Sequence, residues 1–252
     1  MNTDLPHADR GVIVALDFDH RRAAEALVER LGDACDFYKI GLELLTAAGP
    51  GLARDLVARG HEVFLDLKLF EIPNSVAGAV RAAGALGASM VTVHAMGGTG
   101  IMSAAVEAAR EFPRLRVLAL TVVTSMTGSD LADIGVAADT EEQVLRLARL
   151  AEGAGCDGVI ASPREAMAVR GLLGPDRLVV TPGVVLEPEG GAAGGHARPG
   201  TPRAAFAAGA SHVVVGRSVA RAADPVAALR RVRAAAGAVG AVGAVGAVGA
   251  VG

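Results

Sequence analysis

The chain has 252 residues, of which 52% are hydrophobic, and its formal net charge is −3 at pH 7. This composition allows a sizeable core, and the scattered Lys and Arg residues form no basic patch that would favour nucleic acid or a membrane surface. The absence of Trp and the presence of a single Tyr also argue against a surface on which single-stranded bases stack.

Eight short apolar runs are predicted to be strands, and segments with helical spacing of apolar residues lie between them. The expected strands are 11–17, 37–41, 63–68, 90–94, 117–122, 158–161, 178–181 and 212–216. The expected helices are 21–31, 42–59, 76–86, 102–110, 141–152, 164–173, 203–208 and 225–235.

The order of these elements predicts an α/β fold, a single-domain (β/α)8 TIM barrel. The strands are continuous apolar runs, as expected of parallel strands buried on both faces, and eight strand–helix units fit the usual size of this barrel. A doubly wound open sheet is the competitor, but no Gly-x-Gly-x-x-Gly motif follows the first strand.

Both ends of the chain are predicted to lie outside the barrel of residues 11–236. Residues 1–10 form a polar N-terminal extension without an apolar signal core, and residues 237–252 repeat Ala-Val-Gly, which predicts a mobile or weakly docked tail. No apolar run is long enough to span a membrane. The two cysteines, Cys35 and Cys156, have no metal-ligand spacing and are expected to be buried free thiols in the cytoplasm.

Polar residues follow most of the predicted strands, which is where a barrel of this kind carries its chemistry. Asp66 and Lys68 end the third strand, and their spacing of two places both side chains on one face. Together with Lys39 and the nearby Glu71 they are expected to form an array of lysines and carboxylates. Such an array can stress a substrate carboxylate beside an ammonium group that protonates a carbanion, without a metal or an organic cofactor.

The ends of the last two strands predict a phosphate site. Barrels often hold phosphate between the loops after strands seven and eight. The backbone N–H groups of Gly183, Gly216 and Arg217 could face the anion, and the Arg217 guanidinium could add a charge-assisted contact. A phosphorylated small molecule is therefore the expected ligand.

These stretches resemble the orotidine 5′-monophosphate decarboxylase family from about Gly11 to Arg233. The matching segments are Val14-Ala15-Leu16-Asp17, Tyr38-Lys39-Ile40-Gly41, Phe64-Leu65-Asp66-Leu67-Lys68, Ile72-Pro73-Asn74-Ser75, Val93-His94-Ala95, Leu120-Thr121-Val122-Val123-Thr124-Ser125-Met126, Thr181-Pro182-Gly183 and Val215-Gly216-Arg217-Ser218. The combination of Asp-x-Lys with Ile-Pro-Asn is the most discriminating, because related phosphate-binding barrels share only Asp-x-Lys.

The resemblance implies decarboxylation of orotidine 5′-monophosphate to UMP, the final step of de novo pyrimidine synthesis, by a homodimer with shared active sites. It implies that Asp66 lies beside the substrate carboxylate and that Lys68 protonates the carbanion. It also implies that Asp17 and Lys39 hydrogen-bond the ribose hydroxyls and that Ser75 contacts the ribose across the subunit interface. Ser125 would bond the pyrimidine edge, and Glu71 would belong to the partner's site. The phosphate would be bound by Arg217 and by the turns at Pro182-Gly183 and Gly216.

Several positions depart from the family pattern. Glu71 stands where Asp is usual, and a carboxylate misplaced by about 1 Å can cost about a hundredfold in rate. Phe70 replaces a common His, and Val184-Val185 replaces a usual Ile-Arg. His196 aligns with the usual Gln of the loop from Leu186 to Gly200, which is rich in Gly and Ala and is expected to be mobile.

Two alternatives stay open at this point. One is another phosphosugar lyase or isomerase on the same barrel, which would not need a pyrimidine contact at Ser125. The other is a degenerate barrel that binds a nucleotide but lost catalysis through Glu71 and the altered loop.

Overall fold

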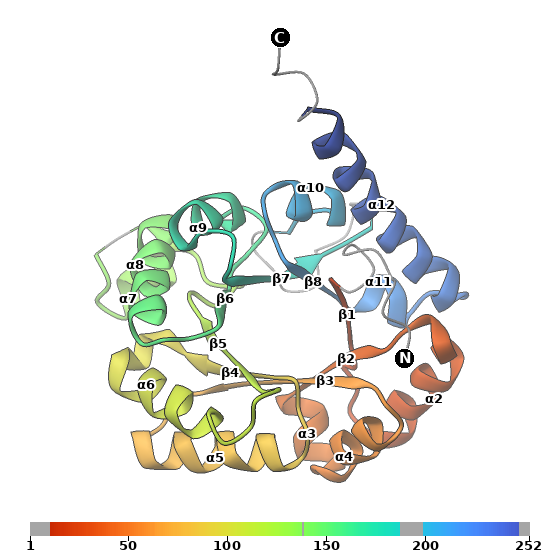
Figure 1. Ribbon diagram of the computed structural model, residues 1–252, viewed down its shortest axis with the longest axis horizontal. Helices are drawn as coiled ribbons and strands as arrows, with labels where there is room; N and C mark the ends of the chain where they lie inside the picture. The colour runs from red at the N-terminus through yellow and green to blue at the C-terminus, as the bar shows by residue number, and fades with distance from the viewer. Residues whose placement is uncertain (1–10, 138, 187–198, 247–252) are drawn as a thin grey trace.

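Eight parallel strands close into a barrel in the order β1-β2-β3-β4-β5-β6-β7-β8, and helices surround it (Figure 1). The computed structural model describes residues 11–137, 139–186 and 199–246, with residues 237–246 described by backbone alone. The predicted (β/α)8 barrel is confirmed. No helix of the described chain is long and apolar enough to cross a membrane.

The first half of the barrel runs from β1 to β4. Its elements are β1 (Val12–Ala15), α2 (Arg21–Leu31), η1 (Gly32–Ala34), β2 (Phe37–Gly41), α3 (Leu42–Ala48), α4 (Gly51–Ala58), β3 (Glu62–Leu69), α5 (Pro73–Ala85), β4 (Met90–His94) and η2 (Ala95–Gly97).

The second half runs from α6 to α12. Its elements are α6 (Gly98–Ala109), β5 (Arg116–Leu120), α7 (Gly128–Asp133), α8 (Thr140–Gly153), β6 (Gly158–Ile160), α9 (Ala166–Leu173), β7 (Leu178–Val184), α10 (Pro202–Ala207), β8 (His212–Val215), α11 (Arg217–Ala220) and α12 (Pro225–Gly246).

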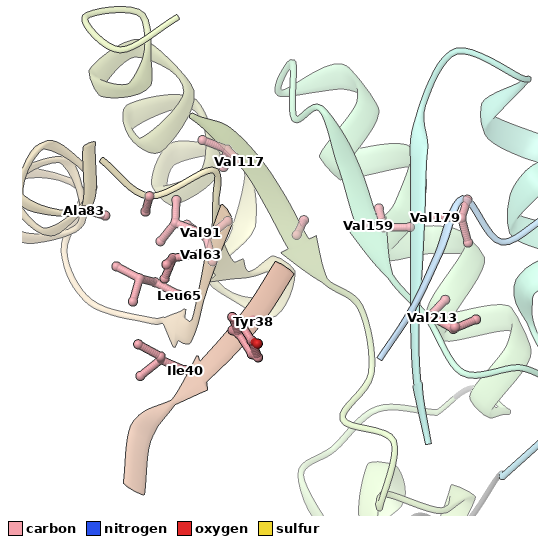
Figure 2. Packing of buried hydrophobic residues seen from close by; sticks show 14 of the residues in the cluster. Tyr38, Ile40, Val63, Leu65, Ala83, Val91, Val117, Val159, Val179 and Val213 are labelled. Carbon is pink, nitrogen blue, oxygen red and sulfur yellow. The ribbon is translucent and has the colours of Figure 1, made fainter. Parts of the chain in front are cut away.

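Alternate residues of each strand face two different hydrophobic layers. One layer fills the barrel interior and includes Ile13, Phe37, Phe64, Met90, Leu118, Ile160, Val180 and Val214. The other lies between strands and helices, and Figure 2 shows part of it, including Tyr38, Leu65, Val91 and Val213. Because Lys39, Asp66 and Thr92 follow Phe37, Phe64 and Met90 by two residues, they continue the interior face toward the carboxyl ends of the strands.

The single helix expected over 42–59 is wrong, because the structure has two helices there. Gly49 ends α3 with a φ of 68°, a left-handed conformation that glycine adopts without strain, and Pro50 cannot continue the helical hydrogen bonds. The short helices α7 and α11 were not expected either. Thr127 and Asp130 form a capping box at the start of α7.

Two strands are longer and less regular than expected. β3 shifts register against β4 between Leu65 and Leu69, and β7 shifts against β8 between Thr181 and Val184. Both irregularities lie at the carboxyl ends of their strands, next to predicted site residues. At the other end of the chain, α12 continues into the Ala-Val-Gly repeat as far as Gly246 and projects beyond the barrel (Figure 1). The division of the chain at residue 236 stays a prediction.

Candidate active site

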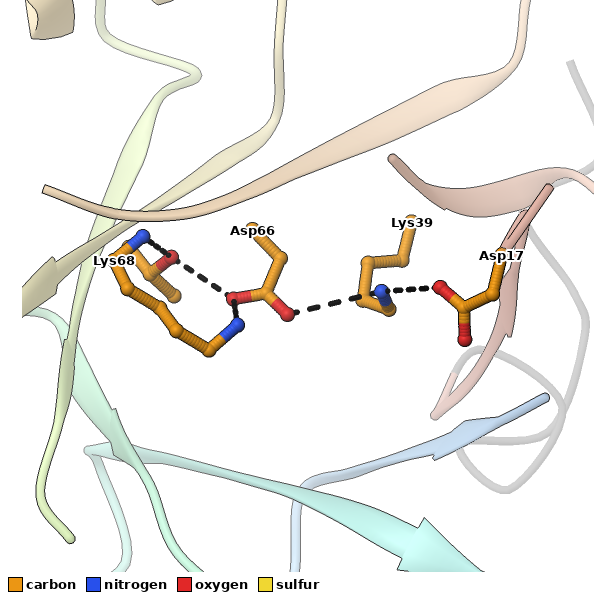
Figure 3. Close-up of polar contacts among 5 residues, drawn as sticks. Asp17, Lys39, Asp66 and Lys68 are labelled. Atoms are coloured by element: carbon orange, nitrogen blue, oxygen red, sulfur yellow. Dashed lines mark hydrogen bonds and ion pairs between the residues drawn. The ribbon is translucent and has the colours of Figure 1, made fainter. Parts of the chain in front are cut away.

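Four charged side chains lie in a row across the carboxyl ends of the first three strands (Figure 3). Lys39 Nζ on β2 lies 2.9 Å from Asp17 Oδ1 and 3.7 Å from Asp66 Oδ2. Lys68 Nζ lies 2.8 Å from Asp66 Oδ1. Anions and cations therefore alternate, in the order Asp17, Lys39, Asp66, Lys68, and we call these four residues the charge array.

The centre of the charge array is more buried than its two ends. The side chains of Lys39 and Asp66 are 11% and 15% exposed, whereas those of Lys68 and Asp17 are 34% and 55% exposed. Glycine at position 41 makes this crowding possible, because a Cβ there would lie 3.2 Å from Lys39 Nζ. Coulomb interactions are stronger at such partly buried positions than at the surface, so water screens the pair of Lys39 and Asp66 less than it screens the two ends of the array.

Lys68 reaches the charge array in a different way from the one the sequence predicts. The expected strand does cover Asp66 to Lys68, but it is irregular there, because Lys68 has a φ of 50° within the register shift of β3. The ammonium group nevertheless meets Asp66. The side chains are brought together by a bent, left-handed backbone and not by simple alternation.

A cavity of about 530 Å³ opens above the charge array. All four residues of the array line it, together with Gly183, Gly216 and Arg217 from the two last strand ends. Glu43, Val184, Val185, Ser218 and Arg221 also line it and were not predicted. Arg221 follows Arg217 by four residues, so helical spacing was the signal that could have found it.

The balance of charge in the cavity suits an anionic ligand. Four cations and three carboxylates line it, and the cations Arg217 and Arg221 follow β8, the strand that pairs with β1. Gly183 has a φ of 76° within the irregular end of β7, a conformation that glycine adopts without strain. The turns that were predicted to hold phosphate thus share one cavity with the predicted reactive groups.

Other predicted site residues lie away from this cavity in the described chain. Ser125 is exposed after β5, and Pro182 is half-buried in β7 without lining the cavity. Glu71 accepts hydrogen bonds from the Ile72 backbone and the Ser75 hydroxyl, which lower the pKa of its carboxyl. These bonds hold Glu71 at the start of α5, in solvent. His196 lies outside the described residues.

Thr92 on β4, which contacts the charge array, was missed from the sequence. Thr92 hydrogen-bonds to Asp66 and to the Lys68 backbone, although in sequence it reads as an ordinary β-branched strand residue. His94 stacks against Phe70 with ring centroids 5.5 Å apart. Burial and the nearby Lys68 cation lower the pKa of His94. Among the described residues, no group of three or more His, Cys, Asp or Glu side chains could hold a metal ion.

Comparisons with known proteins agree with this architecture. Residues 10–232 match the family described as "Orotidine 5'-phosphate decarboxylase / HUMPS family". An orotidine 5′-phosphate decarboxylase from Rhodopseudomonas palustris (strain TIE-1) is 50% identical over 89% of this chain and 92% of its own length. The one from Moorella thermoacetica is 46% identical over 90% of this chain and 92% of its own length.

A solved structure is similar over nearly the same region. The crystal structure of orotidine 5′-phosphate decarboxylase from Lactobacillus acidophilus superposes with a TM-score of 0.79 at 36% identity, covering 89% of this chain and 97% of that one. Sequence and architecture thus agree over almost the whole barrel. The chain belongs to the orotidine 5′-phosphate decarboxylase / HUMPS family.

Proposed function

We propose that the chain decarboxylates orotidine 5′-monophosphate to UMP and CO2, the last step of de novo pyrimidine synthesis. The observation that carries this proposal is the charge array beneath a cavity that Arg217 and the Gly183 and Gly216 turns also line. Relatives about 50% identical over most of the chain bear the name of this activity. The alternating array supports a reaction in which a carboxylate leaves and a proton arrives.

The charge array accounts for both halves of the reaction. The substrate carboxylate sits beside Asp66, and the repulsion between the two anions is relieved when neutral CO2 departs. The electron pair of the broken carbon–carbon bond stays on the pyrimidine ring as a carbanion. Lys68 Nζ then donates a proton to that carbon and regains one from water. Lys39 keeps Asp66 and Asp17 in place, 3.7 and 2.9 Å from its ammonium group.

The remaining contacts bind the parts of the substrate that do not react. Asp17 and Lys39 hydrogen-bond the ribose hydroxyls, Ser125 the pyrimidine edge, and Arg217 with the turns at Gly183 and Gly216 the phosphate. The ribose and phosphate parts of this assignment are supported by the cavity, because Asp17, Lys39 and Arg217 all line it. Binding energy from the phosphate can then be used to hold the carboxylate against Asp66.

Turnover by the purified full chain tests the proposal. Orotidine 5′-monophosphate should disappear with formation of UMP and CO2, and the rate should be unchanged by a metal chelator. A UMP-like inhibitor should compete with the substrate, whereas pentose phosphates should not. The absence of turnover at high enzyme concentration, with UMP still bound, would instead indicate a degenerate nucleotide-binding barrel.

We also propose that the chain works as a homodimer in which Glu71 and Ser75 complete the partner's active site. Glu71 is fully exposed, and the neighbouring side chains of Phe70 and Ile72 are 60% and 61% exposed. Two large apolar side chains in solvent beside an active site suit burial against a second copy. The loop that carries them leads from β3 into α5, so it starts two residues after Lys68.

Mixed dimers test this sharing of residues. Lys68→Met and Glu71→Gln should each be nearly inactive as homodimers. After the two variants are unfolded together and refolded, about a quarter of the wild-type activity should return, because half of the dimers are mixed and each carries one intact site. If no activity returns although mixed dimers form, Glu71 does not act in the partner's site.

Two further assignments complete the proposal. Residues 11–236 form the catalytic unit, with 1–10 and 237–252 outside it, and the family match over residues 10–232 supports this division. A cytoplasmic location is supported by Cys35 and Cys156, which are buried free thiols as expected in a reducing compartment.

A further inference from the structure

The backbone of Lys68 adopts a conformation that needs support from its surroundings. Among the described residues, Lys68 is the only one other than glycine with a positive φ, at 50°. Side chains with a Cβ disfavour this left-handed region, and such residues persist only where neighbouring groups hold them there. This conformation lies within the register shift between β3 and β4. The regular geometry of β3 therefore does not fix the position of the Lys68 backbone from which the side chain extends.

Thr92 on β4 supplies that support through one hydroxyl group. Its Oγ1 accepts a hydrogen bond of 2.9 Å from the Lys68 backbone N–H and donates one of 3.0 Å to Asp66 Oδ1. Thr92 is fully buried on the interior face of β4. A hydroxyl has one proton, so accepting from Lys68 directs that proton to Asp66.

The two bonds fix the reactive groups relative to each other. Asp66 Oδ1 receives both the Thr92 hydroxyl and the Lys68 ammonium group, the latter at 2.8 Å. The same hydroxyl therefore anchors the backbone from which the Lys68 side chain extends and the carboxylate that this side chain meets. Loss of the hydroxyl would leave a buried N–H without its partner and free the Asp66 carboxylate to rotate.

We propose that Thr92 is a positioning residue for proton transfer: its hydroxyl holds the left-handed backbone at Lys68 and orients the Asp66 carboxylate. This inference rests on the proposed decarboxylation. Thr92 itself does not need to touch the substrate. Its effect should appear in the chemical step, because misplacing a proton donor by about 1 Å can cost about a hundredfold in rate while leaving distant binding contacts intact.

The test compares Thr92→Val, which keeps the shape but removes the hydroxyl, with Thr92→Ser, which keeps the hydroxyl. Thr121→Val is the matched control, because Thr121 is equally buried but its hydroxyl donates to the Ile160 carbonyl, at 2.9 Å, instead of to a member of the charge array. The kcat and KM for orotidine 5′-monophosphate, the affinity for UMP and the thermal unfolding midpoint are measured for each protein. If Thr92→Val does not fold, Thr92→Ala takes its place with the same expectation.

We expect Thr92→Val to lower kcat by about ten- to a hundredfold with KM and UMP affinity nearly unchanged, and Thr92→Ser to restore most of the rate. Thr121→Val should keep kcat even if it unfolds at a lower temperature. The inference is overturned if Thr92→Val keeps kcat within about twofold, or if Thr121→Val loses as much. Inactivity of the wild-type chain would be a separate result, because it refutes the proposed function before any variant is compared.

Discussion

Replacing Lys39 by methionine removes the cation that joins the two carboxylates of the charge array. At 3.7 Å, the attraction between Lys39 and Asp66 is about 4 kcal/mol with an effective dielectric constant near 20. Dehydrating the ammonium group in the folded protein opposes part of this attraction. Asp66 also keeps its contact with Lys68. We therefore expect Lys39→Met to lower the free energy of unfolding by about 2 kcal/mol.

Arg21 offers a matched control because it also joins two carboxylates. Its guanidinium lies 2.7 Å from Glu25 and 2.5 Å from Asp55, but the Arg21 side chain is 40% exposed and that of Asp55 is 54% exposed. Exposed ion pairs contribute roughly 0–1 kcal/mol. Arg21→Met should therefore destabilise the protein less than Lys39→Met does.

Urea unfolding followed by circular dichroism measures both changes, since the chain has no Trp to report unfolding by fluorescence. The comparison holds if the two variants and the wild type unfold with the same dependence on urea concentration. An equal loss of stability in the two variants would refute the argument from burial. A Lys39→Met protein more stable than the wild type would mean that dehydration of the cation exceeds its attraction to Asp66.

Two further predictions concern the phosphate and the pH dependence of stability. Arg217→Ala should raise KM for orotidine 5′-monophosphate by about ten- to a hundredfold. The slow turnover of orotidine, which lacks the phosphate, should not change. An equal effect on both substrates would contradict the assignment of Arg217 to the phosphate. The pKa of His94 is lowered from 6.5 in the folded protein, so the His94 imidazole binds a proton more readily in the unfolded chain. The contribution of His94 to the free energy of unfolding is therefore fully present above about pH 6.5 and is lost as the pH drops below it. His94→Asn should weaken that fall in urea midpoints between about pH 5 and 7, and an unchanged pH dependence would contradict it.

The order of strands and helices was readable from the sequence because each strand is a short apolar run. The two-residue period then places Lys39 and Asp66 on the interior face, two residues after Phe37 and Phe64. This period stops being informative where β3 shifts register. No local sequence pattern around Lys68 predicts its left-handed conformation, because contacts with another strand hold it.

Parts of the candidate site depend on contacts that the sequence does not encode locally. Thr92 resembles any β-branched residue of a buried strand, and only the pairing of β3 with β4 brings its hydroxyl to Asp66. Glu71 was recognisable as a charged residue close to Lys68. Within one chain, however, it accepts hydrogen bonds from the Ile72 backbone and the Ser75 hydroxyl, and its proposed role depends on a second subunit.

The central claim is that Lys68 donates the proton that completes the reaction. The most direct measurement compares the wild type with Lys68→Met in turnover of orotidine 5′-monophosphate and in binding of UMP. We expect kcat to fall by about a thousandfold or more, because a positioned general acid contributes about a hundred- to ten-thousandfold and the array loses a charge as well. The affinity for UMP should stay close to that of the wild type. Near-normal turnover by folded Lys68→Met would contradict the account.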